Sequence, residues 1–155
     1  PDWDNIRVEL VDIWHFVMSE SIRIGDQEYA NKFLMLEPKG SFDVDILVDS
    51  LEEMLSLSVA SCIQSETNNI RKITDLFFTI ISHLDIDIEN LYKRYVVKNQ
   101  LNTFRQQNGY KDGSYIKNWD GVEDNVVAFE IMDSNPSITP SDLYKKLNLK
   151  YSLNK

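Results

Sequence analysis

The chain has 155 residues, 43% of them hydrophobic, and a formal net charge of −9 at pH 7. This length fits one domain with a substantial core, and no apolar run approaches the roughly 18 residues of a membrane span, so a membrane protein and a disordered chain are excluded. The acidic balance disfavours nucleic acid and anionic membranes as partners, because the field of the protein repels polyanions. The single cysteine, Cys62, excludes an internal disulfide framework, and without a visible targeting segment we expect a cytoplasmic protein.

Apolar residues recur mostly at intervals of three and four, and strand signals are weak, so the sequence predicts an all-α fold. The expected helices, in chain order, cover residues 4–23, 26–36 (as one helix or a pair of short turns), 43–65, 68–83, 86–107, 123–132 and a last segment that follows the capping sequence NPSITPSD. No internal repeat divides the chain, so we assign residues 1–155 to a single domain.

The first predicted helix carries two carboxylates one turn apart, Glu9 and Asp12, in the sequence ELVDIWHF. Side chains three residues apart lie about 60° from each other on a helix, so both can reach one bound ion. Mg²⁺ prefers carboxylate oxygens and water, which makes the pair a candidate metal site, although an acidic solvated face gives the same spacing. The apolar neighbours favour the metal site. His15 either completes the ligand set, donates a hydrogen bond to a ligand beside the metal, or is a satisfied core histidine.

One stripe of the helix predicted over 86–107 is apolar in its first half and polar in its second. An apolar face that includes Leu91 continues as Lys98, Asn102 and Arg105. Turning cations toward a core costs free energy unless an anion lies there, and arginine, lysine and asparagine together suit a phosphate chain. The alternative is that Lys98 and Arg105 pair with acidic side chains at the edge of the core.

Charge is unevenly distributed along the chain. Residues 1–92 hold 18 of the 25 acidic residues and 6 of the 16 basic ones, whereas residues 93–117 hold six basic residues and one acidic residue, Asp112. A basic segment in an acidic protein suggests a small anionic ligand that is held locally. The segment is too short and too rich in glycine to follow a nucleic-acid groove.

The segment NGYKDGSYIKNWDGVEDN, residues 108–125, carries three of the five glycines of the chain together with Tyr110, Lys117 and Trp119. Glycine lets a backbone approach a ligand closely, Tyr110 and Lys117 extend the phosphate-binding set, and Trp119 anchors the segment against the helices. We therefore predict that this segment is a lid over the bound phosphate.

Two motifs, ELVDIWHF at 9–16 and KNQLNTFRQQNGYKDGSYIKNWDGVEDN at 98–125, closely resemble those of the dimeric dUTPases of the all-α nucleoside triphosphate pyrophosphohydrolase superfamily. The second motif is specific over 28 positions, whereas residues 20–90 match only as apolar helices. The resemblance implies a helical bundle of that type. It also implies a Mg²⁺-dependent homodimer that hydrolyses dUTP and dUDP to dUMP, with water attacking the β-phosphorus, and so keeps uracil out of DNA.

By the same resemblance, Glu9 and Asp12 would be Mg²⁺ ligands and catalytic carboxylates, and His15 would contact the deoxyribose 3′-hydroxyl. The residues that would hold the phosphate chain are Lys98, Asn102, Arg105, Tyr110, Lys117 and Asn125. In this family a preceding helix with an E-x-x-E pair completes the metal site, and residues further upstream help to recognise uracil. We therefore expect this chain to be the C-terminal portion of such an enzyme.

Two alternatives remain beside this interpretation. A related enzyme would cleave another deoxynucleotide, such as dCTP, because the base-reading segment lies outside the sequence. A nonenzymatic helical protein would keep the nucleotide pocket as a sensor or as a partner-binding surface. A substrate panel separates the first alternative, and nucleotide binding without turnover identifies the second.

Overall fold

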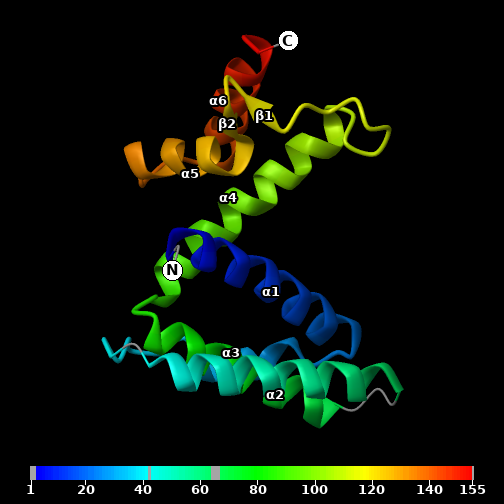
Figure 1. The fold of residues 1–155 in the computed structure, drawn as a ribbon, viewed down its shortest axis with the longest axis vertical. Coiled ribbons are helices and arrows are strands. Elements are labelled where there is room, and N and C mark those ends of the chain that lie inside the picture. Colours follow the sequence, from blue (N-terminus) through cyan, green and yellow to red (C-terminus); the bar gives the residue numbers. More distant parts are fainter. Residues whose placement is uncertain (1–2, 42, 64–66, 155) are drawn as a thin grey trace. The chain divides into compact units, whose positions relative to one another are not determined.

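The computed structural model describes residues 3–41, 43–63 and 67–154 (Figure 1). The elements in chain order are α1 (Trp3–Arg23), the 3₁₀ helix η1 (Gln27–Phe33), α2 (Val44–Ile63), α3 (Thr67–His83), α4 (Ile88–Gln107), β1 (Asn118–Trp119), β2 (Val122–Glu123), α5 (Asp124–Ser134) and α6 (Pro140–Ser152). Helices dominate the described residues, which confirms the predicted all-α fold, and the helix bounds lie within a few residues of those expected. The chain forms two compact units, Pro1–Leu91 and Tyr92–Lys155, and each is described by itself.

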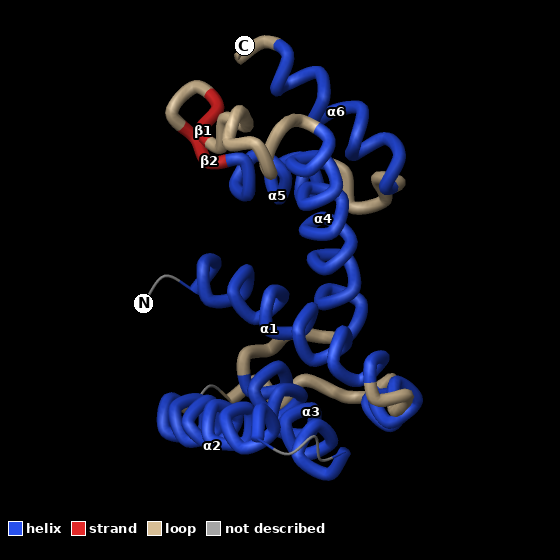
Figure 2. The backbone as a smooth tube through the Cα atoms, turned by 90° about the vertical axis from the view of Figure 1, so that its right-hand side faces the viewer, coloured by secondary structure: helices blue, strands red, loops and turns tan. Residues whose placement is uncertain are grey.

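In the first unit, α3 packs against α2, α1 and η1 (Figure 2). Its apolar residues recur with helical spacing, and Phe77 and Phe78 are buried at the centre of the unit. Trp14 of α1 stacks on Phe77 with ring centroids 5.1 Å apart, and Phe33 of η1 stacks on Phe78 at 4.2 Å. Aromatic side chains from three helices therefore pack together in this unit.

The segment predicted over 26–36 forms the single 3₁₀ helix η1, and polar contacts fasten it to α3. The Arg71 guanidinium donates to both carboxylate oxygens of Asp26 at 2.7 and 2.8 Å. The Tyr29 hydroxyl donates to Asp75 at 2.9 Å, and the Lys32 ammonium pairs with the same carboxylate at 2.6 Å. Together with the stacking of Phe33 on Phe78, these contacts hold η1 to α3.

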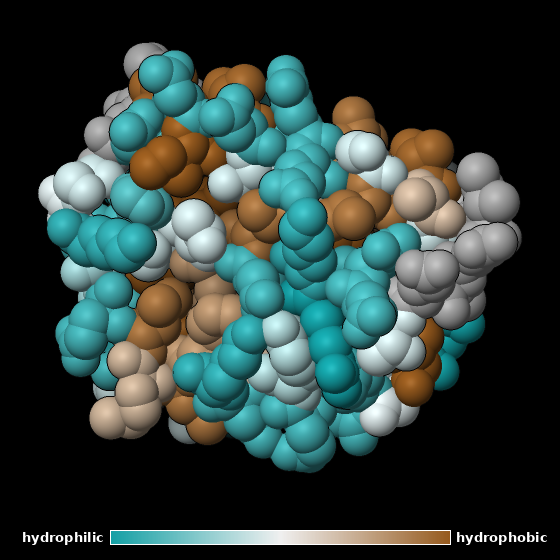
Figure 3. Space-filling view, turned by 90° about the horizontal axis from the view of Figure 1, so that it is seen from below, coloured by the Kyte–Doolittle hydropathy of each residue, from teal (hydrophilic) through white to brown (hydrophobic). Residues whose placement is uncertain are grey.

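The second helix, α2, carries an exposed apolar stripe. Among its described side chains only Ser50 and Met54 are buried. Its exposed apolar residues recur every three or four positions and so share one face: Val44, Val48, Leu51, Leu55 and Val59. Figure 3 views the molecule from the side where α2 and α3 lie in Figure 1, and brown apolar side chains interrupt the teal polar surface there.

The second unit contains most of α4 together with the β1–β2 hairpin, α5 and α6. Thr139 caps α6 as predicted, since its hydroxyl accepts a hydrogen bond from the backbone N–H of Asp142 and Pro140 occupies the first turn. Leu143, Leu147 and Tyr151 of α6 are buried in this unit. Within the described residues, no helix is apolar and long enough to cross a bilayer.

Candidate functional site

One face of α4 turns cations inward. Lys98 is 5% exposed and Arg105 is 8% exposed, and Asn102, between them on the helix, is partly buried. Leu101 and Phe104, on the neighbouring stripe, are fully buried. The buried apolar stripe fixes the orientation of α4, so Lys98 and Arg105 are buried as well. Buried cations require partners of opposite charge or hydrogen bonds.

Arg105 finds its partner in Asp124, the first residue of α5. Its Nε and Nη2 atoms donate to the two carboxylate oxygens at 2.8 and 2.7 Å, and Asp124 is only 1% exposed. Tyr115 adds a third hydrogen bond, from its hydroxyl to Asp124 Oδ2 at 2.7 Å. For Arg105, the structure thus shows the pairing with an acid that the sequence left open as an alternative.

The contacts with Asp124 raise the pKa of both Arg105 and Tyr115. Burial lowers the pKa of the Arg105 guanidinium, but the hydrogen bonds and charge of Asp124 outweigh that effect, so the pKa lies above its usual value. Burial, together with the hydrogen bond to Asp124 and its charge, raises the pKa of Tyr115 above that of a free tyrosine. Arg105 therefore stays charged and Tyr115 stays a hydrogen-bond donor at physiological pH.

The outer edge of the Arg105 guanidinium meets two neutral amides. Nη1 donates to Asn102 Oδ1 at 3.3 Å, and Nη2 donates to Asn125 Oδ1 at 3.2 Å. Lys98 Nζ also donates to Asn125 Oδ1, at 3.4 Å. An oxygen therefore lies between two cations here, a position that would suit a phosphate oxygen better than a neutral amide.

Tyr110 and Lys117 extend this cluster to the surface. The Tyr110 ring centroid lies 6.0 Å from Arg105 Cζ and 5.5 Å from Lys117 Nζ, and both Tyr110 and Lys117 are exposed. The structure thus brings together all six residues that the sequence assigned to the phosphate chain: Lys98, Asn102, Arg105, Tyr110, Lys117 and Asn125. We refer to these six residues as the basic cluster.

The segment after α4 is more structured than the sequence predicted. Asn118 pairs with Glu123 and Trp119 with Val122 in a short antiparallel hairpin. The turn residues Asp120 and Gly121 both have positive φ, 52° and 86°, as the Asp-Gly turn of a tight hairpin requires. The expectation of a loop at this place was wrong, and the Asp-Gly dipeptide was the signal that could have revealed the hairpin.

Aromatic packing anchors most of this segment, as predicted for Trp119. Trp119 is 2% exposed and donates from its ring nitrogen to the Ile116 carbonyl at 2.8 Å. The Phe104 ring lies edge-on to Trp119 at 5.9 Å and to Tyr115 at 6.2 Å, and Tyr115 stacks on Tyr151 at 5.2 Å. Tyr115 and Trp119 are thus held to α4 and α6, whereas the side chains of residues 110–114 and 116–118 are exposed.

The local backbone requires a glycine at position 109. Its φ is +92°, and a Cβ atom there would lie 1.9 Å from Ser114 Oγ, so no other residue fits without a shift of Ser114. Its carbonyl accepts from the Ser114 backbone N–H at 3.0 Å, which closes the turn. We expected the glycines of this segment to admit a ligand, but the structure gives Gly109 and Gly121 a role in turns.

The carboxylate motif lies on α1, in the first unit. Glu9 is exposed, and Asp12 and His15 are partly buried. His15 Nδ1 lies 2.8 Å from the Val11 carbonyl oxygen. Because a carbonyl only accepts, Nδ1 carries the proton in this contact, and the neutral ring then offers Nε2 as an acceptor. An acceptor at this atom suits a hydroxyl ligand.

Glu9 and Asp12 fit part of a magnesium site. Mg²⁺ in nucleotide enzymes is usually held by carboxylates, substrate phosphates and water, so two acids one turn apart can supply part of the ligand set. Among the described residues, no group of three or more His, Cys, Asp or Glu side chains is placed to hold a metal ion. The pair therefore fits Mg²⁺ as a partial ligand set.

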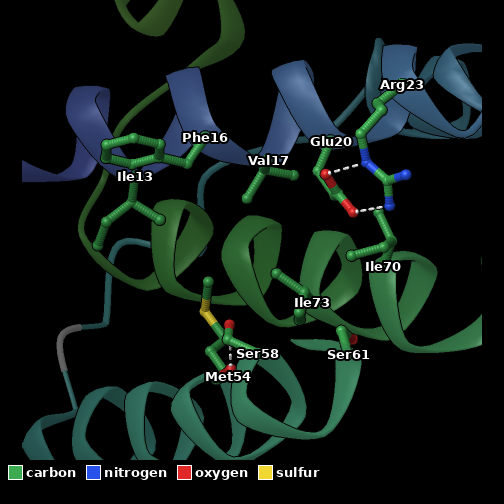
Figure 4. A pocket seen from close by; sticks show the side chains of 10 residues that line it. All are labelled: Ile13, Phe16, Val17, Glu20, Arg23, Met54, Ser58, Ser61, Ile70 and Ile73. Carbon is green, nitrogen blue, oxygen red and sulfur yellow. Dashed lines mark hydrogen bonds and ion pairs between the residues drawn. The ribbon is translucent and has the colours of Figure 1, made fainter. Parts of the chain in front are cut away.

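A pocket of about 570 Å³ also lies in the first unit, between α1, α2 and α3 (Figure 4). Its polar groups already have partners. Arg23 donates to both carboxylate oxygens of Glu20 at 2.8 and 2.5 Å, and the hydroxyls of Ser58 and Ser61 donate to carbonyls of their own helix. The remaining lining is apolar, so this pocket does not suit a phosphate chain.

Asp124 and Tyr115 are the residues of the candidate site that sequence reasoning did not single out. Two cations turned toward a core require an acid nearby, and the acids of the segment GVEDN were the nearest candidates. The spacing alone did not reveal which acid faces α4, because that depends on how the hairpin turns the chain back.

Comparison with known proteins identifies the family. A family model described as dUTPase matches residues 1–110. This match includes Glu9, Asp12 and the part of the basic cluster that lies on α4, and it ends before Lys117 and Asp124. No curated protein matches the chain. Since the match covers more than half of the chain, the protein belongs to this all-α family of dUTPases, which are hydrolases acting on dUTP.

Proposed function

We propose that the enzyme hydrolyses dUTP, and also dUDP, to dUMP in a Mg²⁺-dependent reaction in which water attacks the β-phosphorus. The observation that carries the proposal is the basic cluster. Lys98, Arg105 and Lys117 gather with hydrogen-bonding side chains in a protein whose net charge is −9. Cations concentrated against the overall charge of a protein favour a small polyanion as the ligand.

Each group in the basic cluster has a distinct role in this proposal. Lys98 and Lys117 supply point charges, Arg105 supplies directed N–H donors, and Asn102 and Asn125 supply amides that turn between donating and accepting. A phosphate chain held by several donors presents its reacting phosphorus in one orientation, and positioning of this kind is a large part of catalysis of phosphoryl transfer.

Glu9 and Asp12 would hold Mg²⁺ through their carboxylates. The bound ion supplies charge neutralisation of the phosphates and lowers the pKa of a coordinated water. His15, with Nε2 as acceptor, would receive a hydrogen bond from the 3′-hydroxyl of the deoxyribose. A ribonucleotide with its additional 2′-hydroxyl then serves as a test of the sugar contact.

Replacing Glu9 by glutamine or Asp12 by asparagine should abolish turnover while the fold stays intact. The loss of a Mg²⁺ ligand removes several kcal/mol of transition-state stabilisation, so kcat should fall by about a hundredfold or more. The measurement is dUMP formation at saturating Mg²⁺, with circular dichroism as the check on folding. Glu37→Gln, at an exposed acid outside the helices, is the matched control. Near-normal kcat in either variant would contradict the role of that carboxylate.

A substrate panel tests the nucleotide. In the complete protein, dUTP and dUDP should be hydrolysed with a kcat/KM at least about tenfold above those for dCTP, dTTP and UTP, since a site that hydrogen-bonds uracil would reject poor matches strongly. Preference for dCTP would instead support the alternative of a related enzyme that cleaves another deoxynucleotide. Tight binding of dUTP and Mg²⁺ with no dUMP formed would support a nucleotide sensor.

We also propose that the protein acts as a homodimer. The exposed apolar stripe on α2 is a surface that a second chain would cover, because a stripe of this kind is unfavourable in water. Sedimentation velocity should give a mass of two chains, and Leu55→Glu, within the stripe, should shift the protein toward monomer. Ser56→Glu, one position along the same helix, is the control. A single-chain mass for the wild type would contradict the proposal.

We restrict the lid proposal to the exposed residues 110–114. Residues 110–114 are exposed, and the Tyr110 ring contacts Tyr115 only edge-on at 6.1 Å, so ordering by nucleotide should be greatest there. With a nonhydrolysable dUTP analogue and Mg²⁺, backbone amide exchange should slow at residues 110–114 more than at 115–119 or in α3, because fixing an exposed segment requires a partner that offsets its entropy. Unchanged exchange at 110–114 would mean that no part of the segment acts as a lid.

A further inference from the structure

Asp124 joins three parts of the second unit. Its carboxylate accepts two hydrogen bonds from Arg105 of α4 and one from Tyr115 of the segment that follows. Its backbone N–H donates to the Lys117 carbonyl at 2.9 Å. Through this single residue, the start of α5 is tied to two members of the basic cluster.

The hydrogen bonds divide the Arg105 guanidinium into two edges. The inner edge, Nε and Nη2, is taken by the charged carboxylate of Asp124 at 2.8 and 2.7 Å. The outer edge, Nη1 and the second hydrogen of Nη2, meets the neutral amide oxygens of Asn102 and Asn125 at 3.3 and 3.2 Å. Arg105 is charged at both edges, but only the carboxylate adds a second charge and the shorter bonds, so an arriving anion displaces the amides before it displaces the carboxylate.

We propose that Asp124 is the positioning residue of the phosphate site. It holds the inner edge of Arg105 so that the outer edge faces the phosphate chain, whose oxygens take the places of the two amide oxygens. The displaced amides of Asn102 and Asn125 turn and present their NH₂ groups to the same anion. This inference rests on the proposed function of the basic cluster. In it, Asp124 acts through Arg105 and does not contact the substrate.

Tyr115 completes the arrangement. Its hydroxyl donates to Asp124 Oδ2, the oxygen that also accepts from Arg105 Nε, and its ring is fixed by stacking on Tyr151. A carboxylate held from two directions keeps one orientation, and so does the guanidinium bound to it. Lysine in place of Arg105 cannot bind Asp124 and a phosphate through two separate edges, because it has a single nitrogen.

The test is a double-mutant cycle of Asp124→Asn with Arg105→Lys, read as kcat/KM for dUTP and as the Kd for inorganic pyrophosphate with Mg²⁺. Asp124→Asn should weaken both by about ten- to a hundredfold, the size expected for charged hydrogen bonds. Because Asp124 acts through Arg105, the double variant should lie within about twofold of Arg105→Lys alone. A purely structural role would instead give multiplied losses, and that result, or full activity in Asp124→Asn, would overturn the proposal.

Asp133→Asn, at an exposed acid on the same helix, is the matched control and should leave both readouts unchanged. If Asp124→Asn does not fold, Tyr115→Phe replaces it in the cycle. This variant should lose a smaller factor, about two- to tenfold for one hydrogen bond, and the loss should vanish in the Arg105→Lys background. Multiplied losses in this second cycle, or no loss at all in Tyr115→Phe, would likewise overturn the positioning role.

The two readouts separate this inference from the proposed function. If the wild type binds pyrophosphate but does not hydrolyse dUTP, the proposed function fails, while the pyrophosphate cycle still decides the role of Asp124. If the wild type hydrolyses dUTP and the cycle shows multiplied losses, only the inference fails. A wild type that neither binds pyrophosphate nor hydrolyses dUTP contradicts both.

Discussion

A guanidinium that leaves water needs a carboxylate, and in the second unit the buried pair of Arg105 and Asp124 meets that need. Removing one partner of such a buried pair typically costs about 3–5 kcal/mol, because the other charge is left uncompensated. The pair also fixes geometry. It orients the hydrogen bond of Tyr115, sets which guanidinium edge faces outward, and binds the start of α5 to the end of α4. Within the basic cluster, this contact sets the orientation of the Arg105 guanidinium.

Acidic and basic residues are concentrated in different parts of the chain. The first unit holds most of the acids and carries the Glu9 and Asp12 pair, which suits a hard cation, whereas the basic residues of 93–117 suit an anion. Hydrolysis of a nucleoside triphosphate needs both kinds of group, since a metal ion and basic side chains together neutralise the charge that repels the attacking water. In the proposed function, the carboxylate pair and the basic cluster therefore have complementary roles.

Much of this structure could be predicted from the sequence, because most helices carry periodic apolar stripes and α6 also carries a capping signal. The six residues of the basic cluster were predicted as a set, and they lie together. The hairpin at Asp120 and Gly121 was missed, since two-residue strands have no alternation to detect. Asp124 was missed for a related reason, because the direction of its side chain depends on the turn of that hairpin. Glu123 and Asp124 are adjacent in the sequence, and nothing in the sequence shows which of the two is buried.

A crystal structure of the enzyme with a nonhydrolysable dUTP analogue and Mg²⁺ tests the central claim most directly. The account predicts that Arg105 Nε and Nη2 remain on the Asp124 carboxylate, that phosphate oxygens occupy the outer guanidinium edge beside Lys98, and that the Asn125 amide has turned. A guanidinium that leaves Asp124 and grips the phosphate with Nε and Nη2, or a phosphate chain bound away from Arg105, would contradict it.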